Sequence, residues 1–82
     1  MARHEIVSPL PGVFYRHPDP NSPPYAAEGD HVEIGQTVGL VEIMKQFHEI
    51  KSTVTGKFES YAVEDRAEVE PGAVLAHVEV AQ

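Results

Sequence analysis

Lys45 is the side chain in this sequence whose surroundings most suggest chemistry. It lies in the stretch LVEIMKQFHEI, from Leu40 to Ile50, where apolar residues surround a single lysine. The pattern on both sides predicts two strands joined by a tight turn, and the turn itself would consist of Met44 and Lys45. Tight hairpin turns favour Asn, Asp or Gly, because these residues tolerate positive φ. A Met-Lys turn is therefore unusual, and unusual turn chemistry concentrates at functional sites.

The sequence indicates which kind of chemistry Lys45 can support. It places no neighbouring base, no cluster of cations and no buried pocket around this lysine, so a Schiff-base nucleophile is not expected. An exposed, rigidly presented lysine is well placed to be modified by another enzyme. The plain alternative is a solvated lysine in a turn, and the residue pattern alone leaves both interpretations open.

Other reactive arrangements are not evident. No Ser-His-Asp ordering, carboxylate pair or phosphate-binding glycine loop is present, so the chain is not expected to be an enzyme by itself. The histidines are spread along the chain without the paired spacing of a zinc motif, and no metal site is expected. They are His4, His17, His31, His48 and His77.

Size and composition set further limits. With 82 residues the chain is expected to form one domain, 1–82. It has 13 acidic and 6 basic residues and a net charge of −7, which argues against a nucleic-acid partner and suits docking onto basic protein surfaces. No apolar run approaches the roughly 20 residues that span a bilayer, so no membrane partner is expected. The start, MARHEIVSPL, has no secretory signal, which predicts a cytoplasmic protein.

Two halves of the chain resemble one another. Segment 8–14 (SPLPGVF) matches 52–58 (STVTGKF) at an offset of 44 residues. Segments 32–35 (VEIG) and 38–43 (VGLVEI) match 69–72 (VEPG) and 75–80 (LAHVEV) at an offset of 37. The difference between the offsets predicts a seven-residue insertion in the first half, between Phe14 and Val32. Four of the chain's seven prolines lie there, so we expect a protruding loop at about 15–25.

The rest of the sequence reads as short strands. Alternation places Gly39, Val41 and Ile43 on one face of a strand, with Glu42 on the other face. Turn signals separate the strands, and no helical apolar stripe is present. Two similar β halves that cannot bury their own faces should pack together. We therefore predict an all-β fold, a flattened barrel or sandwich of two antiparallel four-stranded sheets with pseudo-twofold symmetry, in which Lys45 lies at the far end from the termini.

These segments carry a resemblance to a known family. From Ser8 to Glu79 the sequence resembles the biotinyl domain of biotin carboxyl carrier proteins, of the biotin/lipoyl attachment family and the barrel-sandwich hybrid fold. The family's attachment motif is usually Glu-Ala-Met-Lys-Met, and here it reads Glu42-Ile43-Met44-Lys45-Gln46. The stretch FYRHPDPNSPPY resembles the protruding thumb of carriers from bacterial and plastid acetyl-CoA carboxylases.

The resemblance implies a function and a set of partners. Biotin would be joined in amide linkage to Lys45 by a biotin protein ligase, with Glu42, Ile43, Met44 and Gln46 forming the recognised site. The biotin would then carry carboxylate from a biotin carboxylase to a carboxyltransferase, most simply for malonyl-CoA formation in fatty acid biosynthesis. The domain would be a non-catalytic carrier, because the cofactor does the chemistry and the protein positions it.

The sequence departs from the family motif at two positions, and several other functions remain as alternatives. Ile43 replaces the usual alanine and Gln46 the usual methionine or leucine, and both would touch the ligase. Arg66 stands where carriers commonly place glycine, at a cost of about 1 kcal/mol if its φ is positive. The rivals are a carrier for another biotin-dependent carboxylase, a lipoyl domain, and an unmodified binding barrel. The lipoyl motif, typically Asp-Lys-Ala, differs on both sides of Lys45.

Overall fold

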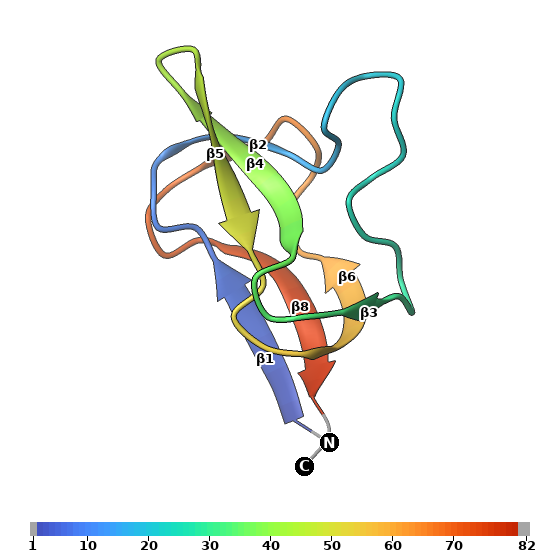
Figure 1. The fold of residues 1–82 in the computed structure, drawn as a ribbon. Helices are drawn as coiled ribbons and strands as arrows, with labels where there is room; N and C mark the ends of the chain where they lie inside the picture. The colour runs from blue at the N-terminus through green and yellow to red at the C-terminus, as the bar shows by residue number, and fades with distance from the viewer. Residues whose placement is uncertain (1, 81–82) are drawn as a thin grey trace.

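A computed structural model describes residues 2–80 of the protein. In it the chain forms β-strands joined by turns and loops (Figure 1). The strands are β1 (Ala2–Val7), β2 (Gly12–Tyr15), β3 (His31–Val32), β4 (Thr37–Ile43), β5 (Gln46–Lys51), β6 (Gly56–Tyr61), β7 (Glu68–Val69) and β8 (Val74–Val80). No helix within 2–80 is long and apolar enough to cross a membrane.

The strands form two antiparallel four-stranded sheets, which confirms the predicted fold class. One sheet has the order β1-β8-β6-β3 and the other the order β5-β4-β2-β7. The duplication relates the two sheets strand by strand, because β1 corresponds to β5, β8 to β4, β6 to β2 and β3 to β7. Each sheet therefore contains strands from both halves of the chain. The β4–β5 hairpin lies at one end of the molecule, and β1 begins and β8 ends at the other (Figure 1).

The core lies between the sheets and is built from equivalent residues of the two halves. Phe14 and Phe58 are both buried, and the ring of Tyr61 packs against both, with centroids 5.9 Å and 4.7 Å away. The Tyr61 hydroxyl donates a hydrogen bond to the Val38 carbonyl at 2.8 Å, and burial raises the pKa of this tyrosine to about 12. The other core members are Ile6, Ala26, Val32, Val38, Val41, Ile50, Val69, Leu75, Ala76 and Val78.

Hydrogen bonds repeat the symmetry in detail. The buried Ser8 hydroxyl donates to the Leu10 carbonyl at 2.5 Å, and the equivalent Ser52 hydroxyl donates to Val54 at 2.6 Å. The Arg66 N–H donates to the Phe14 carbonyl at 2.6 Å. At the equivalent place the Gly29 N–H donates to the Phe58 carbonyl at 2.8 Å. The φ of Arg66 is 69° and that of Gly29 is 92°, so the arginine occupies the left-handed conformation that the sequence comparison suggested.

The structure extends the repeat beyond the part detected in the sequence. The sequence match begins at Ser8 and does not predict strand β1. Its residues pair with β8 along the edge of a sheet, as those of β5 pair with β4. The signal was present: His4, Glu5 and Ile6 have identical partners in His48, Glu49 and Ile50 at the same offset of 44.

Simple alternation fails in β4, where burial continues from Val38 to Val41. Val41 faces the core as predicted, but Leu40, on the opposite face, is only 9% exposed. It lies beside Tyr15 in the sheet register, and the loop that follows β2 approaches this face with Pro18 and Pro20. Both faces of β4 are therefore covered, so the strand does not show the simple alternation of a half-exposed strand.

The connection between β2 and β3, residues 16–30, is a long loop that contains four of the chain's seven prolines. It runs along the side of the molecule, in cyan and teal (Figure 1). Arg16 ties its root to the turn after β6: its N–H donates to the Asp65 carboxylate at 2.8 Å and its guanidinium to the Val63 carbonyl at 2.6 Å. The Tyr25 N–H donates to the Arg16 carbonyl at 2.8 Å and closes the loop.

Candidate functional site

The β4–β5 hairpin ends in a two-residue turn made of Met44 and Lys45. Ile43 pairs with Gln46 across the turn, and the ladder continues down both strands. The φ angles of Met44 and Lys45 are 50° and 66°, so both central residues have the positive φ that a type I′ turn requires. The turn predicted from the sequence is confirmed, and so is the mismatch between its residue types and its conformation.

This conformation is unfavourable for side-chain-bearing residues by about 1–2 kcal/mol each. The paired strands on both sides impose it, because β4 is a central strand whose register is fixed by the buried Val41. The hairpin therefore holds Met44 and Lys45 in a defined geometry.

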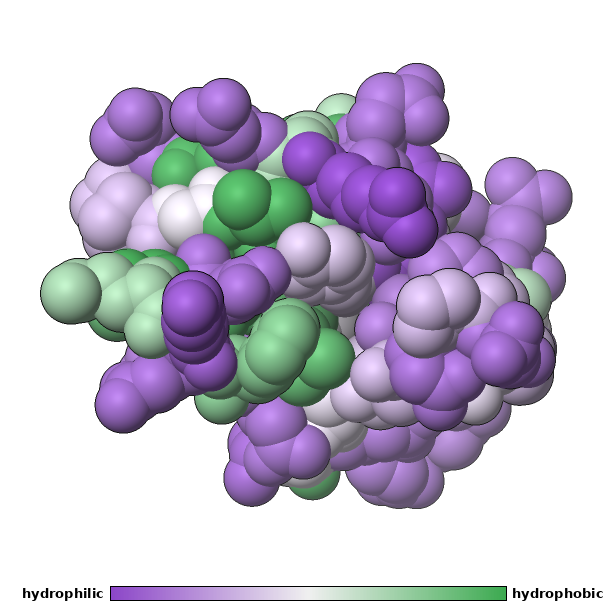
Figure 2. Space-filling model, turned by 90° about the horizontal axis from the view of Figure 1, so that it is seen from above, coloured by the Kyte–Doolittle hydropathy of each residue, from purple (hydrophilic) through white to green (hydrophobic). Residues whose placement is uncertain are grey.

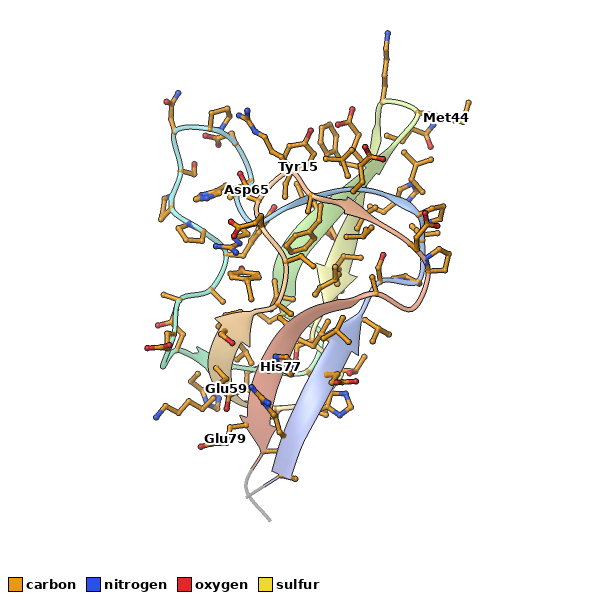
Figure 3. The ribbon with its side chains drawn as sticks, turned by 180° about the vertical axis from the view of Figure 1, so that it is seen from behind. Tyr15, Met44, Glu59, Asp65, His77 and Glu79 are labelled. Carbon is orange, nitrogen blue, oxygen red and sulfur yellow. The ribbon has the colours of Figure 1, made fainter. Side chains whose placement is uncertain are left out.

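The tip of the hairpin is strongly exposed. Met44 is 90% exposed, and Lys45 and Gln46 are also exposed. Within residues 2–80 the Lys45 ammonium takes part in none of the ion pairs. Figure 3 shows Met44 pointing away from the tip, and Figure 2 looks onto this end, where apolar and hydrophilic side chains lie side by side. The tip offers a primary amine that an approaching enzyme can reach.

Ile43 belongs to the core rather than to the exposed tip. It is half-buried and packs against the core cluster. A methyl group added at Gly12 would lie 3.0 Å from the Ile43 side chain and 2.4 Å from the Glu42 carbonyl. The absent side chain of Gly12 therefore leaves room for the isoleucine. Among the five residues predicted for the site, Met44, Lys45 and Gln46 form the exposed group.

Glu42 lies on the outer face of the sheet with two residues that the sequence analysis did not include in the site. The Tyr15 hydroxyl donates a hydrogen bond to the Glu42 carboxylate at 2.9 Å. The Tyr15 ring packs against Phe47 at 5.9 Å between centroids, and Phe47 is 57% exposed. The hydrogen bond to Glu42 is the main cause that raises the pKa of Tyr15. The only sequence signal for these contacts was that Tyr15, Glu42 and Phe47 occupy strands with alternating faces.

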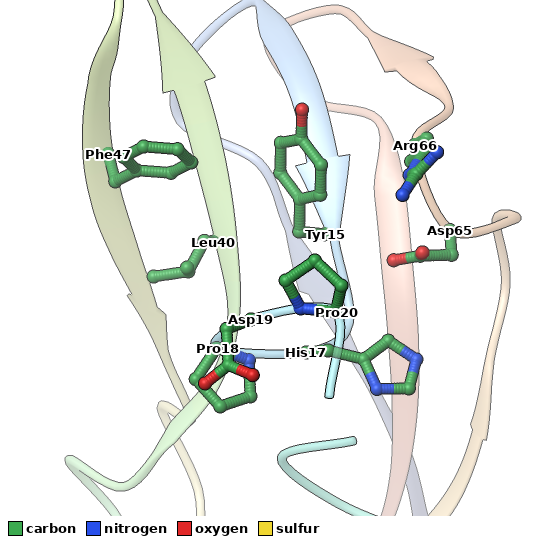
Figure 4. Close-up of a pocket in the computed structure, with 9 residues that line it drawn as sticks. All are labelled: Tyr15, His17, Pro18, Asp19, Pro20, Leu40, Phe47, Asp65 and Arg66. Carbon is green, nitrogen blue, oxygen red and sulfur yellow. The ribbon is translucent and has the colours of Figure 1, made fainter. Parts of the chain in front are cut away.

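A groove of about 510 Å³ continues from this cluster towards the loop (Figure 4). Phe47 and Leu40 lie on one side, Tyr15 in the middle, and Asp65 and Arg66 on the other side. Its full lining is Tyr15, His17, Pro18, Asp19, Pro20, Leu40, Phe47, Asp65 and Arg66. The groove thus combines apolar walls with a phenol, a guanidinium and carboxylates. No group of three or more His, Cys, Asp or Glu residues in the described part of the chain is placed to hold a metal ion.

Fold and site together define a small β domain that presents one exposed lysine at a hairpin tip. Comparison with known proteins gives this class a family. A family model described as biotin-requiring enzyme, the biotin/lipoyl family, matches residues 4–78, and the chain belongs to this family.

Known relatives agree with this membership. The chain is 39% identical over 74 residues to a biotin carboxyl carrier protein of acetyl-CoA carboxylase from Pyropia yezoensis, covering 90% of this chain and 47% of that protein. It is 37% identical over 73 residues to the Chlamydia muridarum protein of the same name, covering 89% and 45%. It spans less than half the length of these relatives.

A solved structure gives the same result for the fold. The crystal structure of Kluyveromyces lactis urea carboxylase matches with a TM-score of 0.79 and 29% identity, over 96% of this chain and 6% of that one. These comparisons confirm the resemblance to carriers of acetyl-CoA carboxylase that the sequence suggested.

Proposed function

We propose that this chain, 1–82, is a single biotinyl domain that carries biotin in amide linkage on Lys45, as the carrier domain of an acetyl-CoA carboxylase. The observation that carries the proposal is the exposed lysine held at positive φ in a two-residue turn, in a chain of the biotin/lipoyl family. The names of the relatives support the choice of carboxylase.

The residues present fit an attached biotin. The Lys45 amine is reachable and the hairpin holds its backbone, so the side chain extends from the domain. When bound, biotin accepts a carboxylate at one active site and gives it up at another. The chain's part is to present and move the group, because attachment to a tether converts each encounter with an active site into a local event. The domain is therefore a non-catalytic carrier.

The partners proposed are a biotin protein ligase, a biotin carboxylase and a carboxyltransferase in the cytoplasm, serving malonyl-CoA formation and fatty acid biosynthesis. Met44 and Gln46 lie exposed on either side of Lys45 and suit recognition by the ligase. The net charge of −7 favours docking onto basic surfaces of the other two enzymes. No nucleic acid or membrane partner is proposed.

We assign residues at about 15–25 to the thumb of acetyl-CoA carboxylase carriers. Apart from Tyr15, which ends β2, this segment lies in the long loop after β2. Its Pro18 and Pro20 line the groove that also includes Phe47, two residues from Lys45 in the sequence. This shared groove supports a role for the loop in contacting the carried ring. A carrier domain of another carboxylase is the second candidate, and the match to urea carboxylase is the observation that favours it.

The test is ligation in vitro. The purified chain, biotin, ATP and a bacterial biotin protein ligase are incubated, and the intact mass is measured. We expect a gain of one biotinyl group in the wild type and in the control Lys51→Arg, and no gain in Lys45→Arg. A wild-type mass that does not change, or a gain that persists in Lys45→Arg, would reject the proposal.

A further inference from the structure

The acidic residue closest in sequence to Lys45 is Glu42, three positions before it on the same hairpin. Glutamate and lysine side chains are long, and such neighbours commonly form ion pairs across a tight turn. Within residues 2–80, however, Lys45 takes part in none of the ion pairs. The Glu42 carboxylate instead accepts the hydroxyl hydrogen of Tyr15 at 2.9 Å.

Two contacts, from β4 and β5, position the Tyr15 side chain beside Glu42. The neighbouring strand β4 pairs with it through Leu40, and its ring packs against Phe47 of β5 at an interplanar angle of 56°. Residues paired directly across antiparallel strands share a face, so Leu40 and Tyr15 share the outer face, and Glu42 and Phe47 share it also. The hydroxyl therefore holds the carboxylate against the outer face of the sheet.

The charges around this pair leave the hydrogen bond in place near neutral pH. The pKa of Tyr15 is raised, chiefly by the bond to Glu42, so the phenol keeps the proton that it donates. From the turn between β6 and β7, Arg66 acts in the opposite direction and Asp65 in the same direction, both more weakly. The strand register places three more charged residues on this face: Glu68 of β7, across Val13 from Glu42, and Glu49 and Lys51 of β5. The loop adds His17 and Asp19 beside the groove.

We propose that Tyr15 is a positioning residue for the modification of Lys45: its hydroxyl holds the Glu42 carboxylate aside and keeps the lysine amine free of an intramolecular ion pair. This rests on the proposed function only for its biological purpose. In acyl transfer the nitrogen lone pair forms a bond to the acyl carbon, the bond from that carbon to its leaving group breaks, and the amine proton passes to solvent. A carboxylate paired with the ammonium favours the protonated form, which has no lone pair to react.

The size of the effect follows from what exposed ion pairs contribute. Pairing an exposed ammonium with a carboxylate favours the charged form by about 1.5-fold to fivefold. Removing the Tyr15 hydroxyl should therefore slow acylation of Lys45 by about that factor at neutral pH. High salt should reduce the difference in Lys45 acylation rate between the wild type and the variant without the hydroxyl, because an ion pair between Glu42 and Lys45 would be exposed to solvent and screened.

The experiment uses the full chain and a limiting amount of a small reagent, the N-hydroxysuccinimide ester of acetic acid. Peptide mass spectrometry gives the acetylation of Lys45 relative to Lys51 and Lys57 in the same molecule. Tyr15→Phe, which keeps the ring, is compared with the wild type, and the same change is made in a Glu42→Gln background. We expect the slower Lys45 reaction in Tyr15→Phe and no effect of this change in the Glu42→Gln background.

Two results would overturn the inference. One is an unchanged relative rate at Lys45 in Tyr15→Phe. The other is a loss of the same size in the Glu42→Gln background, which would mean that the hydroxyl acts on the hairpin rather than through the carboxylate. Circular dichroism verifies that the variants are folded. No ligase is used, so failure of Lys45 to accept biotin is a separate outcome that does not affect this measurement.

Discussion

Replacing Ile43 by alanine tests whether this departure from the family motif serves the core. The side chain is half-buried and packs against the core cluster next to Gly12. A fully buried isoleucine loses about 2–5 kcal/mol on truncation to alanine, and the partial exposure of Ile43 reduces this to about 1–2 kcal/mol. In a domain of this size about 1 kcal/mol corresponds to roughly 4–8 °C in Tm, so we expect Tm to fall by about 5–15 °C.

The assay is thermal and urea unfolding followed by circular dichroism, with Met44→Ala as the matched control. Met44 is the next residue in the hairpin and is 90% exposed, so its truncation should change stability by less than about 0.5 kcal/mol. Equal effects of the two substitutions would refute the assignment of Ile43 to the core. The effect of Gln46 on ligase recognition stays a separate prediction.

Three further predictions concern the backbone and the loop. Arg66→Gly should stabilise the domain by about 0.5–1 kcal/mol, because it relieves a positive φ of 69° and the flexible unfolded chain offsets part of the gain; a lower urea midpoint would contradict this. Gly56→Ala should cost about 3 kcal/mol or more, because the new methyl would lie 2.3 Å from the Glu79 carbonyl, and a near-native melting curve would exclude the clash. Deletion of residues 17–23 should leave a cooperative melting transition by circular dichroism, because the second half folds without this insertion; loss of the transition would show that the loop is structural.

Much of the fold was predictable because the sequence is duplicated. Matching segments at two offsets predicted symmetric β halves, and the structure repeats even single hydrogen bonds, as at Ser8 and Ser52. The turn at Met44 and Lys45 was predictable from local pattern alone, since two apolar strands with two residues between them leave few other arrangements. The sequence identified Arg66 as standing in place of a family glycine, but it left open the sign of its φ, which the structure gives as positive.

What remained hidden depends on residues far apart in the chain. The burial of Leu40 on the outer face requires the loop after β2 to fold back over β4. The hydrogen bond between Tyr15 and Glu42 joins positions 27 residues apart, and no periodicity identifies such a partner. Strand β1 was missed for a different reason: it lies outside the sequence match, which begins at Ser8, although His4, Glu5 and Ile6 are identical to His48, Glu49 and Ile50.

The turn that bears Lys45 is also the seam between the two repeats, since β4 ends the first copy and β5 begins the second. The pseudo-twofold symmetry makes the two ends of the domain equivalent, but a turn joins neighbouring strands, β4 and β5, at only one of these ends. At the other end the backbone enters at β1 and leaves at β8 (Figure 1). A polypeptide fused at either of these points would therefore depart from the side opposite the amine. A flexible linker attached there would let the whole domain move between distant docking sites while Lys45 stays at the end farthest from the linker.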